Sequence, residues 1–331
     1  MRALLIVNPF ATSTTDAGRD ALADTLSAKI DLSVELTTHR GHAGEIAARA
    51  RAQGCPIVIV HGGDGTVNEV VNGLLDAPGD PIGPNPAPAL AVIPGGSANV
   101  FARSLGIDPD PMKATAQLLT LLAERSRRRI SLGHLSAEAP KRPGSTPSPA
   151  AASGRWFLFN AGMGVDAEVV ASIEDQRNAG KPASDARYIA TTVRRFISAS
   201  RRPPQLSVSL PGRDTIDDVH FVFVCNANPW TFIGPRPVWT NPDTTYECGL
   251  GVFASSSMSV TRNLGIFTQL LTGRKPHARH VLTDDDVASV RLTARAPMDV
   301  QMDGDYVGKA TTAAFGCVSD RLEVVAPPLS A

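Results

Sequence analysis

Short apolar runs alternate with helix-period stretches over the first 130 residues, and this alternation constrains the fold more than any other feature. The β-branched and aliphatic runs predict buried strands, whereas the intervening stretches place apolar residues at helical spacing. Strands that alternate with helices form βαβ units, which build a parallel sheet covered on both faces. We therefore expect an α/β, doubly wound, mostly parallel sheet here. The predicted strands are 3–9, 33–38, 56–62 and 90–96, and the predicted helices are 16–30 and 42–53.

The pattern changes after residue 155 to many short strands with turn signals between them. Such clustering predicts a strand-rich, antiparallel, sandwich-like domain, interrupted by helices at 186–198 and 260–271. Residues 136–154 are rich in Pro, Ser and Ala and are expected to form a flexible loop. We therefore expect one domain at 1–135 and a second at 155–328, with the last strands either in the second domain or packed back on the first.

Composition excludes several classes of protein. The chain has 331 residues, a length typical of about two domains. Its 32 basic and 32 acidic side chains cancel, which argues against nucleic acid as a partner. The four cysteines lack metal-site spacing, and no apolar run approaches the ~20 residues of a membrane span. We expect a cytoplasmic protein whose membrane contact, if it has one, is peripheral at the inner membrane surface.

The stretch HGGDGTVNEVVNG, residues 61–73, follows a predicted strand and opens a predicted helix. Gly62, Gly63 and Gly65 permit a tight turn, and the free N–H groups of a helix N-terminus attract anions. Glycine is common in such turns, but strand, glycines and amphipathic helix in this order favour a phosphate-binding loop. The Walker lysine is missing. A metal ion is therefore expected to neutralise the phosphates, with Asp64 holding it directly or through water.

The residues after Gly65 have two readings. Thr66 and Glu69 fit a T-x-x-E capping box, so they either cap the helix or contact a ligand. Asn68 and Asn72 lie four apart on the polar face and would face a ligand or solvent. The apolar positions, which predict one buried helix face, are Val67, Val70, Val71, Leu74 and Leu75.

GGDGTVNEVVNGLL resembles the nucleotide-binding loop of the diacylglycerol kinase catalytic-domain family, which includes bacterial lipid kinases, sphingosine kinases and ceramide kinases. GGDGT alone is shared with NAD kinases and the 6-phosphofructokinase-like superfamily. The stretches NP (8–9), TTHRGHAGEIA (37–47) and PGGSANVFARSLGI (94–107) resemble other nucleotide-contacting elements of the family. The resemblance implies ATP and Mg²⁺ as cofactors. The nucleotide-binding residues that it implies are Asn8, Pro9, Thr37, Gly62, Gly63, Asp64, Gly65, Thr66, Asn68, Glu69, Ser97 and Asn99.

Two later stretches resemble substrate elements of the same family. QMDGDYVG (301–308) resembles the D-G-E element, which implies Asp305 as proton acceptor with Asp303 in support. An ordinary hairpin turn is the alternative, because Asp-Gly is a strong turn signal. FLFNAGMGVDAEVV (157–170) resembles a segment whose acids contact head groups, here Asp166 and Glu168, although acids at a helix start also favour its dipole.

Three positions depart from the family pattern. Val100 stands where Asp is common, and Asp305 replaces Glu, which is one methylene longer. In TTYECGLGVFA (244–254), Cys248 and Gly251 stand where the carboxylates of a structural magnesium site are expected. Because Mg²⁺ needs oxygen ligands, we expect no magnesium ligands from this stretch.

The sequence as a whole predicts an ATP-dependent lipid kinase that phosphorylates diacylglycerol or a related lipid alcohol such as a sphingoid base. Residues 1–135 would bind the nucleotide and 155–328 the lipid. The alternatives are an NAD kinase-like phosphotransferase, which shares GGDGT, and a catalytically weak lipid-binding relative.

Overall fold

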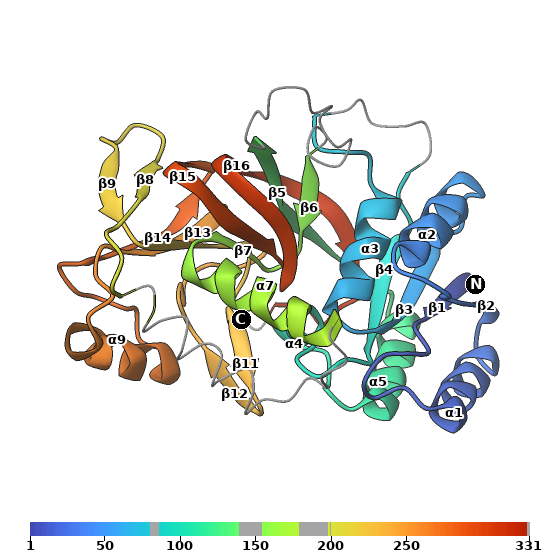
Figure 1. Ribbon diagram of the computed structural model, residues 1–331. Coiled ribbons are helices and arrows are strands. Elements are labelled where there is room, and N and C mark those ends of the chain that lie inside the picture. The colour runs from blue at the N-terminus through green and yellow to red at the C-terminus, as the bar shows by residue number, and fades with distance from the viewer. Residues whose placement is uncertain (80–85, 139–153, 179–197, 199, 330–331) are drawn as a thin grey trace. The chain divides into compact units, whose positions relative to one another are not determined.

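The computed structural model describes residues 1–79, 86–138, 154–178, 198 and 200–329 (Figure 1). The chain divides into two compact units. Unit 1 is Met1–Leu132 with Ser319–Ala331, and unit 2 is Gly133–Val318. The C-terminal residues thus belong to unit 1, one of the two arrangements that the sequence left open. Most of the loop expected at 136–154, and all but the last residue of the helix expected at 186–198, lie outside the described residues.

Unit 1 is built on a parallel sheet in the order β4-β3-β1-β2. The end of β16 (Asp305–Val324) lies parallel beside β4, where Val324 is opposite Leu90. The central strands read as continuous apolar runs because they are buried on both faces. All four predicted strands are confirmed, with bounds β1 (Arg2–Val7), β2 (Asp31–Leu36), β3 (Ile57–Gly62) and β4 (Ala89–Pro94).

Helices cover both faces of this sheet, as a doubly wound fold requires. Figure 1 shows α1 (Asp16–Ser27) and α5 (Pro111–Ala123) together on one face, and α2 (His42–Ala52) and α3 (Asp64–Leu74) on the other. The side chains of Thr15 and Asp110 cap α1 and α5. Helices α2 and α3 pack so closely at Gly73 that a Cβ there would lie 2.1 Å from the Gly44 carbonyl oxygen. The short helix α4 (Val100–Ser104) follows β4.

Unit 2 is strand-rich and antiparallel, as predicted. Its main strands follow the order β14-β13-β10-β7-β15-β16, with β8 also paired to β15. The bounds are β5 (Arg128–Glu138), β6 (Arg155–Phe157), β7 (Asn160–Met163), β8 (Leu206–Ser209), β9 (Ile216–Val219), β10 (Phe221–Cys225), β11 (Thr231–Ile233), β12 (Arg236–Val238), β13 (Leu250–Ser255), β14 (Val281–Val287) and β15 (Ser289–Met302), and the helices are α7 (Val165–Asn178) and α9 (Val260–Thr272). Within the described residues, no helix is long and apolar enough to cross a bilayer.

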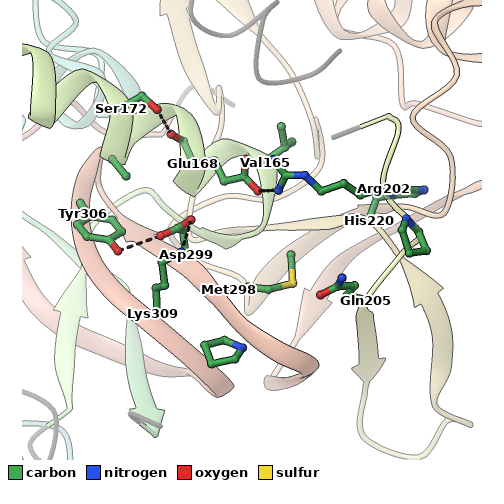
Figure 2. A pocket seen from close by; sticks show the side chains of 13 residues that line it. Val165, Glu168, Ser172, Arg202, Gln205, His220, Met298, Asp299, Tyr306 and Lys309 are labelled. Carbon is green, nitrogen blue, oxygen red and sulfur yellow. Dashed lines mark hydrogen bonds and ion pairs between the residues drawn. The ribbon is translucent and has the colours of Figure 1, made fainter. Parts of the chain in front are cut away.

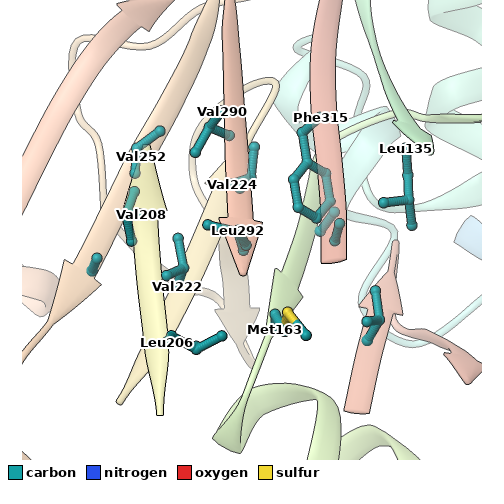
Figure 3. Packing of buried hydrophobic residues seen from close by; sticks show 14 of the residues in the cluster. Leu135, Met163, Leu206, Val208, Val222, Val224, Val252, Val290, Leu292 and Phe315 are labelled. Atoms are coloured by element: carbon teal, nitrogen blue, oxygen red, sulfur yellow. The ribbon is translucent and has the colours of Figure 1, made fainter. Parts of the chain in front are cut away.

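Strand β15 changes partners along its length. The pairing register with β16 breaks between Thr293 and Met298, and the segment before the break pairs with β8 while the segment after it pairs with β7. Pro297 lies in the break, where its missing N–H costs no ladder bond. The strands around this bend enclose an apolar core, which includes Val222, Leu292 and Phe315 (Figure 3).

Candidate functional site

The predicted nucleotide-binding residues of unit 1 gather at the carboxyl edge of its sheet. The N–H of Thr37 donates to the Val7 carbonyl (2.9 Å), and the N–H of Asn8 donates to the His61 carbonyl (2.9 Å). In the same way the N–H of Gly95 donates to the Gly62 carbonyl (2.9 Å). These bonds align the ends of β2, β1, β3 and β4. Ligands of open parallel sheets bind outside this edge.

Two glycine turns pack directly against each other at this edge. A Cβ on Gly96 would lie 2.7 Å from the Cα of Gly63, and a Cβ on Gly95 would lie 3.0 Å from the Cα of Gly62. Side chains are therefore excluded from the contact. The N–H groups of Gly95 and Gly96 already donate to the Gly62 carbonyl and the Asn99 side chain. Phosphate oxygens, which accept hydrogen bonds from free N–H groups, would therefore fit at the N-terminus of α3, which has no side-chain cap.

The capping-box expectation for Thr66 and Glu69 is wrong. Helix α3 begins at Asp64 with Gly63 as its N-cap and without a side-chain cap, so Thr66 lies inside the first turn. The Thr66 hydroxyl instead accepts a hydrogen bond from the Asn8 side-chain amide (3.0 Å). Glu69 accepts the N–H of Gly41 at 2.9 Å. Both side chains thus fasten neighbouring loops to α3, and their nucleotide contacts stay predictions.

Asn68 and Asn99 also have structural partners. Asn68 is buried, and its side-chain carbonyl oxygen accepts from the Asn72 side chain (3.1 Å), so Asn68 does not face solvent, whereas Asn72 is half-buried. Asn99 adopts left-handed backbone angles (φ 47°, ψ 47°), which Asn tolerates better than most residues. Its side chain accepts from the Gly96 N–H (2.8 Å) and donates to the Gly96 carbonyl (2.7 Å). Asn99 therefore closes the second turn, whereas Ser97 is exposed on it.

Asp64 has a role that the sequence did not predict. Its two carboxylate oxygens accept the N–H groups of Val100 and Phe101, each at 3.0 Å, and so cap α4. Burial raises the pKa of Asp64, while these two bonds and the nearby Arg103 guanidinium act in the opposite direction. No group of three or more His, Cys, Asp or Glu suited to a metal occurs within the described residues. Asp64 therefore caps α4, and its magnesium role stays a prediction.

The Asp-Gly stretch of unit 2 forms a tight hairpin turn between β15 and β16. Asp303 and Gly304 have φ of 50° and 79°, and Met302 pairs with Asp305 across the turn. These are the turn conformations that Asp-Gly favours. Asp305 is half-buried at the first position of β16.

The Asp303 carboxylate ties this hairpin to a distant segment. It is only 6% exposed and accepts the N–H groups of Leu158 (2.7 Å), Phe159 (3.0 Å) and Asn160 (3.2 Å). These three backbone donors hold the carboxylate in place against residues 158–160. Asp303 therefore fixes the hairpin that carries Asp305, which accords with the supporting role implied by the resemblance. The catalytic roles of both acids stay predictions.

A cavity of about 460 Å³ lies in unit 2 between α7, β15 and β16. Figure 2 shows charged side chains paired around it. Glu168, which the family resemblance implied as a head-group contact, accepts a hydrogen bond from the Arg202 guanidinium at 2.7 Å. Asp299 accepts from the Tyr306 hydroxyl at 2.9 Å, and the Lys309 ammonium lies 3.6 Å from Asp299. These groups suit a ligand that bears hydroxyls, because they supply both donors and acceptors.

Sequence reasoning found only part of this cavity. It indicated Glu168 but not Arg202 or Asp299, which come from segments remote in sequence. Tyr306 could have been predicted from the sequence, because it follows Asp305 in the stretch that resembles the family's D-G-E element. The side chain of Asp166 lies outside the described residues.

A lysine supplies the positive charge beside the stretch 244–254. The Lys275 ammonium pairs with the carboxylates of Asp285 and Asp243, and the Thr244 hydroxyl donates to the Asp285 carbonyl (3.0 Å). The Asp285 side chain is only 11% exposed. The Lys275 ammonium thus lies between two acids of this region and offsets part of their charge.

The diacylglycerol kinase catalytic domain family matches residues 2–135. This match covers less than half of the chain. The match contains the whole carboxyl edge described above, from Asn8 to Asn99. The kinase family implies a phosphotransferase, for which a nucleotide is the expected phosphate donor.

Curated relatives match part of the chain. A protein of Chromohalobacter salexigens named probable lipid kinase YegS-like is 37% identical over 117 residues, which span 35% of this chain and 35% of its own. A diacylglycerol kinase of Staphylococcus saprophyticus is 33% identical over 140 residues, which span 41% of this chain and 42% of its own. The aligned part therefore covers less than half of each relative.

A solved structure extends the likeness over both units. The crystal structure of a diacylglycerol kinase from Bacillus anthracis matches with a TM-score of 0.68 at 20% identity. It covers 99% of this chain and 97% of the other. At this identity the likeness concerns the fold, and it agrees with a parallel α/β unit followed by an antiparallel one.

Proposed function

We propose that the protein is an ATP-dependent lipid kinase that transfers the γ-phosphate to the hydroxyl of diacylglycerol or a related lipid alcohol. The observation that carries the proposal is the cradle formed by the turns at Gly62–Gly63 and Gly95–Gly96, in the region matched by the kinase family. The names of the curated relatives support a lipid as the acceptor.

In the proposed reaction the lipid hydroxyl oxygen attacks the γ-phosphorus while the bond from that phosphorus to the β–γ bridging oxygen breaks. ADP leaves, and the hydroxyl proton passes to a carboxylate, for which we propose Asp305. A carboxylate can accept this proton only within hydrogen-bond reach of the hydroxyl. Asp303 would act on Asp305 by fixing its hairpin through three backbone bonds.

Positioning and charge stabilisation dominate phosphoryl transfer, because the protein has little covalent chemistry to perform. The N-terminus of α3, which the two glycine turns leave open to a close approach, would receive the phosphates, and Mg²⁺ would arrive with ATP as part of that substrate. Asn8, Thr66 and Glu69 would hold the surrounding loops at the helix start. In unit 2, Glu168 and its paired neighbours would receive the polar head of the lipid.

The experiment incubates the purified chain with γ-labelled ATP, Mg²⁺ and one acceptor at a time: diacylglycerol, a sphingoid base, ceramide or NAD. We expect label in a lipid product. Label in phosphorylated NAD alone would replace the proposal with an NAD kinase activity. Absence of product from every acceptor, with ATP binding retained, would favour a lipid-binding relative without catalysis.

A further inference from the structure

Helix α9 of unit 2 presents an apolar stripe to the surface. Val260, Leu264, Phe267 and Leu271 follow one another at spacings of four, three and four residues, which places them along one side of a helix. They are 56%, 67%, 44% and 52% exposed. Helices at the surface of a globular protein normally turn a polar face outward.

The other side of α9 is firmly attached to unit 2. Ile266 is buried in an apolar cluster with Phe221 and Phe253. The Asn263 side-chain amide donates to the carbonyls of Ser257 and Ser259, each at 2.9 Å. The helix is therefore held in place by its inner face. The apolar stripe is a second apolar face, which this packing leaves exposed.

A neighbouring hairpin extends the apolar surface. The β11–β12 hairpin lies against the end of α9, where the Trp239 N–H donates to the Leu270 carbonyl at 2.7 Å. At the hairpin tip Ile233 is 50% exposed and Arg236 is also exposed. In Figure 1 the helix and this hairpin lie together at the lower edge of unit 2. We call Ile233, Val260, Leu264, Phe267 and Leu271 the docking face.

The sequence around the docking face is basic, although the whole chain has no net charge. Residues 256–280 contain four Arg or Lys and no Asp or Glu, which gives this segment a charge of +4 with His neutral. Lys275 is paired with acids, whereas Arg262, Arg274 and Arg279 are exposed. Arg262 projects from another side of α9 than the apolar stripe, and Arg274 and Arg279 follow the helix in sequence. An apolar stripe on a segment that carries exposed cations fits a surface that offers both acyl chains and negative head groups.

We propose that the docking face of α9 and the β11–β12 hairpin binds the surface of an anionic lipid bilayer. The purpose of this contact rests on the proposed function, since a kinase of diacylglycerol must meet its substrate in a membrane. A second copy of the chain is less suited than a bilayer to cover the docking face. A twofold contact would bring the same basic segment of both copies together, and like charges oppose such pairing.

The test measures co-sedimentation of the full chain with vesicles, without ATP or diacylglycerol. We expect binding to vesicles of phosphatidylcholine with phosphatidylglycerol, and weak binding to phosphatidylcholine alone. Leu264→Asp and Phe267→Asp should each reduce binding about tenfold or more, because each removes apolar burial and adds negative charge. Leu264 is 67% exposed, so its replacement should leave folding unaffected, and circular dichroism checks the fold of both variants.

Met112→Asp is the matched control. Met112 is 47% exposed on α5 in unit 1, so this variant makes a comparable change outside the docking face. We expect it to bind vesicles as the wild type does. Unchanged binding by Leu264→Asp and Phe267→Asp, or an equal loss in Met112→Asp, would overturn the proposal. So would a lipid-free dimer that Leu264→Asp converts to a monomer in sedimentation velocity.

A second part of the experiment, an activity assay, distinguishes failure of this proposal from failure of the kinase proposal. Diacylglycerol is presented either in vesicles or in detergent micelles, and label transfer is measured for the wild type and Leu264→Asp. We expect the variant to lose activity on vesicles while it keeps activity on micelles. If no lipid is phosphorylated in either form, the kinase proposal fails while the vesicle-binding result still decides the docking face.

Discussion

The Asp64 carboxylate and the N–H of Phe101 lie 3.0 Å apart, so the acid of one glycine turn caps the helix that follows the other. The second oxygen accepts the N–H of Val100 at the same distance. This link spans 37 residues of sequence and joins the two turns of the proposed phosphate cradle.

Asp64→Asn should destabilise unit 1. The Asn side chain can accept only one of the two N–H bonds and turns its own NH₂ toward the other donor. We expect the free energy of unfolding to fall by about 1–3 kcal/mol, the usual cost of a buried donor left without its partner. Urea unfolding measures it. Asp24→Asn, on the exposed side of α1, should change stability little, and equal losses in the two variants would argue against the capping role.

His61 should make stability depend on pH. It is 1% exposed, with one ring nitrogen 3.3 Å from the Ile93 carbonyl and the other 3.0 Å from the Thr14 hydroxyl. Burial lowers its pKa, with the Ile93 bond opposing. Below about pH 6.5 the unfolded chain therefore binds a proton that the folded chain does not, so stability present at neutral pH is lost as the pH falls.

The expected slope from His61 is up to about 1.4 kcal/mol per pH unit below about pH 6.5. Urea unfolding at several pH values gives this slope, and His61→Gln should flatten it. Burial also lowers the pKa of His134 and His220, so part of the slope should remain. A slope unchanged by His61→Gln would show that His61 does not carry the effect.

Gly73→Ala should force α2 and α3 apart. Its Cβ would meet the Gly44 carbonyl oxygen at 2.1 Å, and backbone cannot move aside cheaply. We expect a loss of about 1–3 kcal/mol, as for other overpacked cores. Gly265→Ala is the control within another helix, because no atom lies within 4 Å of its added Cβ. That variant should gain up to about 1 kcal/mol from helix propensity. Thermal unfolding of both variants distinguishes packing from propensity.

The sequence predicted the elements of unit 1 well because buried parallel strands give continuous apolar runs and amphipathic helices give apolar residues at helical spacing. It also placed Gly62 and Gly63 in a tight turn before α3, but it did not indicate that the turn at Gly95–Gly96 packs against them. It misplaced the start of α3 by assigning the cap to Thr66, whereas the helix begins at Asp64. The local sequence pattern favoured a capping box. In the structure the side-chain amide of Asn8, 58 residues away, donates a hydrogen bond to the Thr66 hydroxyl.

Long-range partners explain what the sequence could not predict. The bonds from Asp303 to Leu158, Phe159 and Asn160 cross more than 140 residues, and no local period encodes them. The same holds for Lys275, whose pairing with Asp243 and Asp285 depends on how β14 and its neighbours fold. Such contacts follow from tertiary structure and not from residue spacing.

Lys275→Met should destabilise unit 2 by leaving the carboxylate of Asp285 without its cation. Because Lys275 is half exposed, solvent screens part of the effect, and we expect a loss of about 1 kcal/mol. Thermal unfolding of the wild type should not change between EDTA and Mg²⁺, since the Lys275 ammonium already occupies the position between Asp243 and Asp285. A large Mg²⁺-dependent rise in the wild-type melting temperature would contradict this account.

The most direct test of the central claim is the rate at which γ-labelled phosphate enters chloroform-extractable lipid. With diacylglycerol and Mg²⁺·ATP, the wild type should transfer label, and Asp305→Asn should do so about 10²–10⁴-fold more slowly, the range for loss of a general base. Asp214→Asn, an exposed acid of unit 2, should retain the wild-type rate. An equal rate in Asp305→Asn would remove that residue from the mechanism. A wild-type protein that binds ATP but transfers no label to diacylglycerol or any other lipid alcohol would contradict the account itself.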